Sequence, residues 1–383
     1  MKNIMIIVPN LSGGGQERIA AELTKILKDR YKVYLVNFSQ TSDKYDIDPN
    51  TKRIYLNIKE SNSTLKKMSN VLKRCIRIRN LKRKNKIDLS ISFGRSANIV
   101  NSLAKGKEKV IVSIRNTSDT EIKNRNVINT IIYERADKVL FVSKGQCLEA
   151  LKYYSKIEKK CFVIYNPCDV DIIKKKSEEP VDISIGKNTI VSCGRLESVK
   201  CYYNLINSVI LAKKQIEDLE LLIIGEGREY QSLLSYIDQK NAKEYIKILP
   251  FTNNPFAIIS KCKAFVFASR SEGFPNVICE SLACGKAIIS TDCLSGPREI
   301  LGGDIIYGLK NNYSVENNGI LTPVFSAGKN ERYNEEIYAR AIVRIIRDEK
   351  LRKNYEKIAV NRALEFSVDL YKEQIVKFFD ALV

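Results

Sequence analysis

Short apolar runs alternate with amphipathic stretches along the whole chain. The first run, Lys2 to Val8, has the length of one strand, and Gln16 to Lys28 then repeats apolar side chains at helical spacing. Strands that alternate with helices in this way build parallel sheets with helices on their faces. Further runs of strand length occupy residues 32–37, 88–92, 110–114, 139–142 and 162–165. The pattern predicts a doubly wound α/β domain in this part of the chain.

The same alternation begins again after Asn166-Pro167 and predicts a second domain of the same class. Its strands are expected at residues 189–193, 219–224, 246–250, 264–268 and 287–291, followed by helices to the end of the chain. A chain of 383 residues is long enough for two domains of ordinary size. We therefore expect a two-domain α/β protein that divides near residue 170.

The stretch from Ser271 to Glu299 carries the most informative pattern. It follows a predicted strand, and it contains Pro275 at the start of a predicted helix and two carboxylates, Glu272 and Glu280. Glu280 lies about one turn inside that helix, and helical side chains lean toward the N-terminus, so both carboxylates can face the same loop edge. The unpaired N–H groups of the helix start point there too. This arrangement suits a ligand with hydroxyls and phosphate, although a capping carboxylate beside a solvated one would show the same spacing.

Two other loops join a strand to a helix and suit phosphate. Gly13, Gly14 and Gly15 follow the first strand, and successive glycines let a backbone approach a ligand closely. In the second domain Arg195 and Lys200 flank a turn that enters a helix, which is a favourable setting for a diphosphate. A flexible turn and two unrelated cations are the simpler interpretations of these loops.

The composition excludes several kinds of catalyst. The chain contains no histidine, which removes a histidine base, a histidine-ligated metal and any Ser-His or Cys-His nucleophile pair. Its ten cysteines form no CxxC pair, and neither a secretory signal nor an apolar run of membrane-spanning length is present. We therefore expect reduced, mostly buried thiols in a cytoplasmic protein.

Positive charge is concentrated in the first domain. Residues 1–170 carry a net charge of +18 and residues 171–383 carry +2. The segment Leu65 to Lys86 contains ten Lys or Arg and no acidic residue, with an apolar stripe of Leu65, Met68, Leu72, Cys75 and Ile76. A basic amphipathic helix can lie on anionic lipid, but the same stripe could instead pack an outer helix against the sheet. The charge imbalance favours the membrane.

A DxD string occurs at Asp169-Val170-Asp171. Such a string can hold a divalent cation on a nucleotide-sugar, but here it follows Asn166-Pro167 at the predicted domain junction. We interpret it as a linker turn, and we expect neither a metal site nor a cofactor.

Taken together, these segments resemble the GT4 family of retaining, nucleotide-sugar-dependent glycosyltransferases almost end to end. The most specific segment runs from Glu272 to Glu280 and is similar to the family's E-x7-E motif. Gly194-Arg195-Leu196 with Lys200 is similar to its phosphate motif, and the run from Gly13 to Arg18 resembles its N-terminal glycine segment. The resemblance implies the GT-B fold, in which two Rossmann-like domains face a central cleft.

The resemblance also implies roles for the two domains and for individual residues. Residues 1–170 would bind the acceptor, residues 171–365 would bind the nucleotide-sugar, and a last helix within residues 366–383 would pack back on the first domain. Arg195 and Lys200 would hold the diphosphate, and Glu272 would hold sugar hydroxyls near the reacting carbon. The other implied donor-binding residues are Gly194, Glu280, Phe274, Asn276, Val277, Asn253, Gly13, Gly14 and Gly15.

One departure from the family lies after the fifth strand, where many members place a histidine. Arg115 or Asn116 is expected to take its place, and Arg95 is a third candidate on the acceptor or sugar side.

The predicted function is transfer of a hexose or N-acetylhexosamine, with retention, from a nucleotide-sugar to a lipid-linked or polysaccharide acceptor in surface glycan biosynthesis. A UDP-sugar is the expected donor, and the leaving phosphate oxygen would take the acceptor proton. The expected location is the inner face of the cell membrane, bound peripherally through the basic domain. The alternatives are another GT-B enzyme, such as a nucleotide-sugar epimerase, and a non-enzymatic basic nucleic-acid-binding protein.

Overall fold

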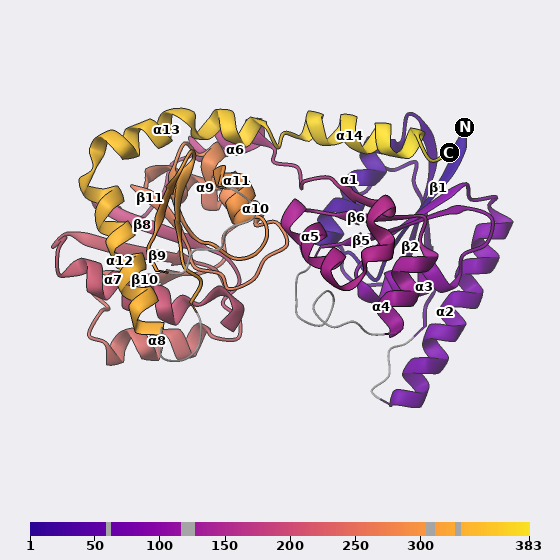
Figure 1. The fold of residues 1–383 in the computed structure, drawn as a ribbon, viewed down its shortest axis with the longest axis horizontal. Coiled ribbons are helices and arrows are strands. Elements are labelled where there is room, and N and C mark those ends of the chain that lie inside the picture. The colour runs from indigo at the N-terminus through magenta and orange to yellow at the C-terminus, as the bar shows by residue number, and fades with distance from the viewer. Residues whose placement is uncertain (59–62, 116–126, 304–310, 326–330) are drawn as a thin grey trace. The chain divides into compact units, whose positions relative to one another are not determined.

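The computed structural model describes residues 1–58, 63–115, 127–303, 311–325 and 331–383. The chain divides into two compact units, one of residues 1–166 with 371–383 and the other of residues 167–370 (Figure 1). Each unit is a doubly wound α/β domain with a mainly parallel sheet, so the predicted fold class is confirmed.

The first unit contains a seven-stranded sheet in the order β3-β2-β1-β4-β5-β6-β7, and all its described strand pairs are parallel. Helices cover both of its faces, which is why strand residues such as Ile4 to Val8 are fully buried. The strands are β1 (Lys2–Val8), β2 (Tyr31–Asn37), β3 (Lys52–Tyr55), β4 (Leu89–Phe93), β5 (Lys109–Ile114), β6 (Lys138–Phe141) and β7 (Cys161–Val163).

Alternate side chains of these strands contact different helices. One face packs on α1 (Gly15–Leu27) and α14 (Val368–Asp380). The opposite face packs on four helices: α2 (Thr64–Lys84), α3 (Arg95–Leu103), α4 (Val127–Arg135) and α5 (Lys144–Tyr153). A 3₁₀ helix at Ser155–Lys160 precedes β7.

The C-terminal residues belong to the core of the first unit. Tyr371, Ile375 and Phe379 of α14 are buried among strand residues that include Ile4. The ring of Phe379 lies edge-on to Tyr31, with 6.4 Å between the ring centroids. The end of the chain therefore completes a core that its first strand begins.

The second unit contains a seven-stranded sheet in the order β10-β9-β8-β11-β12-β14-β13 among its described residues. The strands are β8 (Asn188–Cys193), β9 (Leu219–Ile224), β10 (Ile246–Leu249), β11 (Ala264–Phe267), β12 (Ala287–Thr291), β13 (Ser314–Glu316) and β14 (Gly319–Thr322). The helices are α6 (Val170–Ser177), α7 (Tyr202–Lys213), α8 (Tyr230–Gln239), α9 (Pro255–Lys261), α10 (Asn276–Ala283), α11 (Pro297–Leu301), α12 (Glu331–Arg347) and α13 (Glu349–Leu364).

Three strands were missing from the sequence prediction. The chain was expected to be helical after residue 291, but β13 and β14 form an antiparallel hairpin there. Its turn is Asn317-Asn318, and Gly319 follows as the first residue of β14; Asn and Gly are typical of tight hairpin turns, and this was the available signal. The edge strand β3 has only two apolar residues at its end and no alternation long enough to predict a strand.

The predicted helix over residues 65–86 is confirmed as α2, but its buried face differs from the apolar stripe. Met68, Leu72 and Ile76 are 67%, 63% and 53% exposed, so the alternative in which the stripe packs the helix against the sheet does not hold for these three residues. Of the other two stripe residues, Cys75 is half-buried, and the Leu65 side chain lies outside the described residues. The buried side carries Arg74, Ile78 and Lys82 instead.

A buried polar network fixes α2 in this rotation. The Lys82 ammonium lies 2.8 Å from Oε1 of Glu108 and donates to Oδ1 of Asn101 at 2.7 Å. Ser90 of β4 donates to the same Asn101 oxygen at 2.8 Å. Because a buried lysine needs these partners, Lys82 is held inward together with Arg74 and Ile78, and Ile76, which lies about 120° around the helix from Lys82, faces outward.

Candidate active site

Glu272 and Lys200, two of the predicted site residues, contact each other in the structure. Glu272 follows β11, and Lys200 ends the short 3₁₀ helix Ser198–Lys200 after β8. Nζ of Lys200 lies 2.6 Å from Oε1 of Glu272, and each side chain is only 17% exposed. The ammonium also lies 5.2 Å from the centre of the Phe267 ring. The pair is largely shielded from water, which strengthens its electrostatic attraction.

Neighbouring hydroxyl groups hold Glu272 in place. Oγ of Ser269 donates to Oε1 of Glu272 at 2.6 Å, and Oγ1 of Thr291 donates to the Ser269 carbonyl at 2.6 Å. Oγ of Ser295 donates to the backbone carbonyl of Glu272. The carboxylate and its backbone are therefore fixed from both β11 and β12, as a preorganised site requires. The sequence analysis missed these three hydroxyl residues, whose available signal was their position at or just beyond the ends of predicted strands.

Glu280 lies at the same end of the sheet. Burial raises the pKa of the Cys193 thiol, at the end of β8, to about 12. The Glu280 carboxylate raises this pKa further, and Lys200 opposes it. Both charged groups are thus close enough to Cys193 to act on it. Lys200 contacts Glu272, and both Lys200 and Glu280 influence Cys193 at the end of β8, whereas the roles of the two carboxylates toward a ligand stay predictions.

The helix that carries Glu280 begins one position later than predicted. Pro275 occupies the capping position, and α10 starts at Asn276. Asn276 and Val277 are half-buried in the first turn, where backbone N–H groups lack partners within the helix. The loop before the helix is packed tightly, because a Cβ added at Gly296 would lie 2.4 Å from Cδ of Pro275. Phe274 is buried, and its ring centroid is 5.4 Å from that of Phe366.

Glycine contacts set the shape of the loop after β8. The Gly194 N–H donates to the Ile224 carbonyl at 3.0 Å, and the Leu196 N–H donates to the Glu226 carbonyl at 2.8 Å. A Cβ added at Gly225 would lie only 2.0 Å from the Gly194 carbonyl oxygen. The loops after β8 and β9 can approach this closely only because Gly225 has no side chain.

Two other predicted donor residues lie on the surface of the second unit. Arg195 has a 75% exposed side chain, and its Nη1 lies 3.2 Å from Oε1 of Glu197. Asn253 is exposed in the loop before α9, and the next residue, Asn254, caps that helix by accepting from the Ala257 N–H at 3.3 Å. Both are accessible to a ligand that binds at this end of the sheet.

In the first unit, Gly13 and Gly14 lie in an exposed loop between β1 and α1, and Gly15 is the exposed first residue of α1. Gly13 and Gly14 have φ angles of 128° and 142°, which favour glycine. The Gly14 N–H donates to the hydroxyl of Tyr45 at 3.2 Å. The loop therefore has a defined backbone that other residue types would adopt only with strain.

Arg115 packs within the first unit. Its Nε donates to Oγ of Ser113 at 3.2 Å, its Nη1 donates to Oδ1 of Asn166, and its guanidinium lies 5.1 Å from the Phe93 ring centre. Burial lowers the pKa of Arg115. Through these contacts Arg115 links residues at or after the ends of β4, β5 and β7. The spacing in the sequence did not indicate this role.

Of the other two candidates on the acceptor side, Arg95 is half-buried in the first turn of α3. Asn116 lies outside the described residues.

The DxD string has a local structural role. Oδ1 of Asp169 accepts from the Ile172 N–H at 3.1 Å and so caps α6. Across the described ranges, no group of three Cys, Asp or Glu side chains is placed to hold a metal ion. None of the described helices combines the length and the apolar character needed to cross a bilayer.

Two family profiles match the chain in series. The profile described as Glycosyltransferase Family 4 matches residues 13–172. The profile described as Glycosyl transferases group 1 matches residues 173–362. Together they cover both structural units.

Full-length relatives and a solved structure agree with these matches. The chain is 31% identical to N-acetylgalactosamine-N,N'-diacetylbacillosaminyl-diphospho-undecaprenol 4-alpha-N-acetylgalactosaminyltransferase of Campylobacter jejuni, over 96% of each chain. It is 23% identical, over 98% of each chain, to GalNAc-alpha-(1->4)-GalNAc-alpha-(1->3)-diNAcBac-PP-undecaprenol alpha-1,4-N-acetyl-D-galactosaminyltransferase of the same organism. Its fold is similar to that of Anabaena Alr3699/HepE in complex with UDP and glucose, with a TM-score of 0.75 and 18% identity over 99% of this chain and 100% of that chain. These likenesses confirm the GT-B fold and a glycosyltransferase activity.

Proposed function

Because the chain belongs to glycosyltransferase family 4, we propose that it transfers an N-acetylhexosamine or hexose from a UDP-sugar to a saccharide carried on a polyprenyl diphosphate. The observation that carries this proposal is the shielded Lys200–Glu272 pair, followed by Glu280 in α10, in a chain that matches a diphospho-undecaprenol glycosyltransferase along nearly its whole length. An N-acetylhexosamine is the first sugar to test, because the relative's name specifies N-acetylgalactosamine.

The donor would bind at the ends of β8, β11 and β12. Lys200 and Arg195 would neutralise the diphosphate, and the first-turn N–H groups of α10 would donate to the same oxygens. Glu280 would accept from ribose hydroxyls, and Glu272 would accept from hydroxyls of the transferred sugar. The Lys200 ammonium donates to Oε1 of Glu272 at 2.6 Å, so this cation would lie beside the transferred sugar.

The proposed reaction retains the anomeric configuration. The bond between the anomeric carbon and the diphosphate breaks, the acceptor oxygen bonds to the same face of that carbon, and the leaving phosphate takes the acceptor proton. Since the donor supplies the base, the protein needs only to position the reactants and to stabilise the developing negative charge. The absence of histidine from the chain is consistent with this division of work. The charged groups at the site, a carboxylate and a cation, also suit positioning and charge stabilisation.

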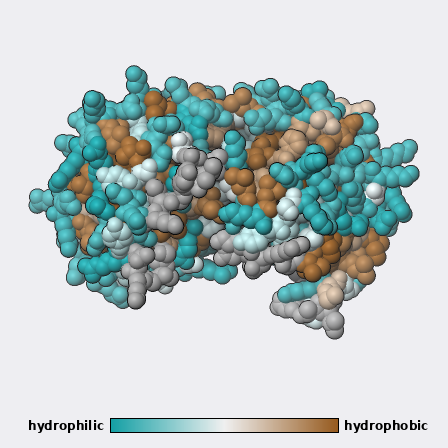
Figure 2. Space-filling view, in the orientation of Figure 1, coloured by the Kyte–Doolittle hydropathy of each residue, from teal (hydrophilic) through white to brown (hydrophobic). Residues whose placement is uncertain are grey.

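The acceptor side would lie at the inner face of the cell membrane, with the protein bound peripherally. The support is α2, on which Met68, Leu72 and Ile76 are exposed apolar side chains. Figure 2 shows brown surface at the lower right, in the region where Figure 1 places α2. The helix also carries a dense set of Lys and Arg and has no acidic residue. Helices of this kind lie in the interface of anionic bilayers.

The donor assignment is tested by thermal stabilisation with UDP-, GDP-, ADP- and dTDP-sugars. We expect a selective rise in melting temperature with one UDP-sugar, and we expect Arg195→Ala to lose it. Lys261→Ala is the matched control, because Lys261 is an exposed cation at the end of α9 in the same unit. Equal stabilisation of Arg195→Ala and wild type would show that the diphosphate binds elsewhere.

The reaction is tested with the selected donor and a synthetic saccharide on a short polyprenyl diphosphate. We expect a new α-glycosidic bond by NMR, which is the configuration that UDP-linked hexosamines carry. A β-linked product would contradict retention. Release or rearrangement of the sugar without transfer to the acceptor would favour the alternative GT-B enzymes.

A further inference from the structure

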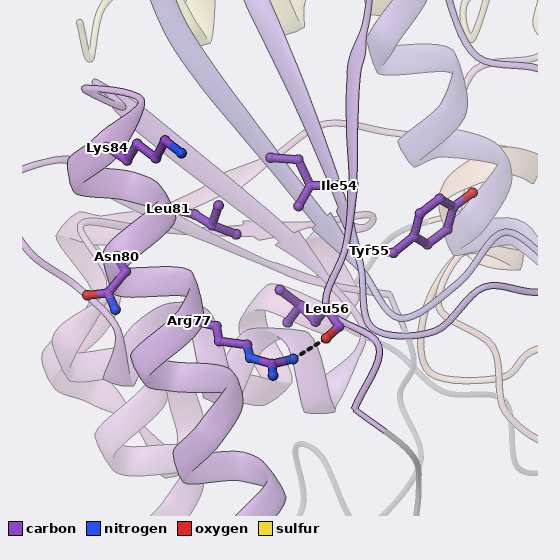
Figure 3. Close-up of a pocket in the computed structure, with 7 residues that line it drawn as sticks. All are labelled: Ile54, Tyr55, Leu56, Arg77, Asn80, Leu81 and Lys84. Atoms are coloured by element: carbon purple, nitrogen blue, oxygen red, sulfur yellow. Dashed lines mark hydrogen bonds between the residues drawn. The ribbon is translucent and has the colours of Figure 1, made fainter.

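A hollow of about 430 Å³ lies between the edge strand β3 and helix α2 (Figure 3). Its volume is within the range of small-ligand sites, roughly 300–1,000 Å³. The residues that line it are Ile54, Tyr55, Leu56, Arg77, Asn80, Leu81 and Lys84. The lining combines aliphatic side chains with two cations and contains no carboxylate, so an anionic amphiphile matches its chemistry better than a sugar or a cation.

The two cations, Arg77 and Lys84, lie at opposite ends of an apolar floor formed by Ile54 and Leu81. Figure 3 shows Arg77 and Lys84 extending from α2 toward β3, with Leu81 between them and Ile54 across from Leu81. Seven residues separate the cations, which places them about 10 Å apart along the helix axis. Arg77 donates to the Leu56 carbonyl, so its guanidinium is anchored beside the strand with further N–H groups left for a ligand.

The hollow extends away from the catalytic loops. The carboxyl end of β3 lies at Tyr55, close to Arg77. Helix α2 runs back from that end, and the chain then passes through Lys84 into β4. Lys84 therefore lies toward the amino ends of the strands. The candidate active-site loops of this unit, such as Gly13 to Gly15, follow the carboxyl ends. The hollow is thus a site separate from them.

One end of the exposed apolar row lies beside the cations. At 3.6 residues per turn, Ile76 lies about 80–100° around the helix from Lys84 and Arg77, with Leu72 next to it, whereas Met68 lies on the side opposite Arg77. The buried Lys82–Glu108 pair stops this part of α2 from rotating. A surface that offers apolar side chains beside two cations is complementary to the interface of an anionic bilayer.

We propose that this hollow binds the headgroup of one anionic membrane phospholipid, while Leu72 and Ile76 enter the bilayer interface beside it. Arg77 would donate to the phosphate at one end of the floor and Lys84 to an ester carbonyl oxygen at the other, with Ile54 and Leu81 in contact with the glycerol between them. This inference rests on the membrane association in the proposed function and adds to it a saturable site at a defined position.

The test compares two double variants with equal loss of charge. Arg77→Gln with Lys84→Gln removes the cations of the hollow, and Arg79→Gln with Arg83→Gln removes two exposed cations from the side of the same helix that carries the apolar row. Both are titrated with vesicles of phosphatidylcholine containing phosphatidylglycerol, and with water-soluble dihexanoyl phosphatidylglycerol. Lys84→Gln alone is included because it keeps the Arg77–Leu56 hydrogen bond.

Non-specific attraction should fall equally in the two double variants. We expect the hollow variant to lose at least a further tenfold in vesicle affinity, and to lose the one-to-one binding of the short-chain lipid that wild type and the control show. We expect Lys84→Gln to weaken that binding at least threefold. Equal losses in both double variants would overturn the proposal, and so would displacement of the lipid by equimolar inorganic phosphate.

The same titration separates this inference from the proposed enzyme. If the wild-type protein binds neither vesicles nor the short-chain lipid, the headgroup site and the membrane association both fail. Transfer from the UDP-sugar to a soluble short-chain acceptor would still be observed in that case. Conversely, a protein that binds the lipid but transfers no sugar would keep the headgroup site and refute the enzymatic proposal.

Discussion

Replacing Lys200 by methionine tests whether the shielded ion pair organises the active site. Its ammonium lies 2.6 Å from Glu272, and both side chains are 17% exposed, so the pair is intermediate between a surface pair and a buried one. Surface pairs contribute about 0–1 kcal/mol, whereas breaking a fully buried pair costs about 3–5 kcal/mol. We therefore expect Lys200→Met to lower the free energy of unfolding by about 2 kcal/mol, which is about 4–8 °C in the melting temperature of a domain of this size.

The assay is a double-mutant cycle with Glu272→Gln, followed by thermal unfolding. Each single variant leaves one charge without its partner, so the double variant should lose less stability than the two single losses combined. Lys243→Met is the matched control. Its ammonium lies 2.7 Å from Asp238, but the two side chains are 64% and 62% exposed, so its loss should cost less than about 0.5 kcal/mol.

Activity is measured on the same proteins. We expect Lys200→Met to lower kcat at least about 100-fold, the effect of losing one preorganised charge-stabilising group, and we expect Lys243→Met to leave kcat unchanged. The reasoning is refuted if Lys200→Met and Lys243→Met are equally stable, or if the losses in the Lys200–Glu272 cycle add to within about 0.3 kcal/mol.

The remaining predictions concern neighbouring groups. Ser295→Ala removes a hydrogen bond to the Glu272 backbone and should lower kcat about tenfold with little change in melting temperature, as measured by steady-state kinetics. Gly225→Ala places a Cβ 2.0 Å from the Gly194 oxygen and should lower the melting temperature of the purified protein, whereas Gly15→Ala, which meets no atom within 4 Å, should not. The raised pKa of Cys193, about 12, should make its alkylation at pH 8 at least about 100-fold slower in the folded than in the unfolded chain, by mass spectrometry. Because the folded state holds that proton more tightly, Cys193 should also make the protein less stable as the pH rises from about 9 to 12.

Local pattern was enough to predict the elements that carry the active site. The run Ala264 to Phe267 is apolar throughout because β11 is buried on both faces, and that made it visible in the sequence. Glu272 and Lys200 were predicted at one sheet edge because both follow parallel strands, whose carboxyl ends lie together. Their direct contact is a finding of the structure that the sequence did not predict, and their roles toward a donor stay predictions.

The features that escaped prediction depend on tertiary contacts. The outward face of α2 follows from the partners of Lys82, which are 19 and 26 residues away along the chain. Arg115 is placed by Asn166, 51 residues away, and no local pattern encodes that contact. The hydroxyl groups around Glu272 were unremarkable in the sequence because serine and threonine occur at many strand ends.

The position of α14 has a consequence for biosynthesis. Because Tyr371, Ile375 and Phe379 complete the core of the first unit, that unit cannot finish folding while the ribosome is still making the roughly 200 residues of the second. At about 5–20 residues per second, the first sheet waits for about 10–40 s with one apolar face uncovered on the side where α14 will pack. During that interval the nascent chain needs protection from aggregation, and a ribosome that stalls before residue 371 would release a first domain without its last helix.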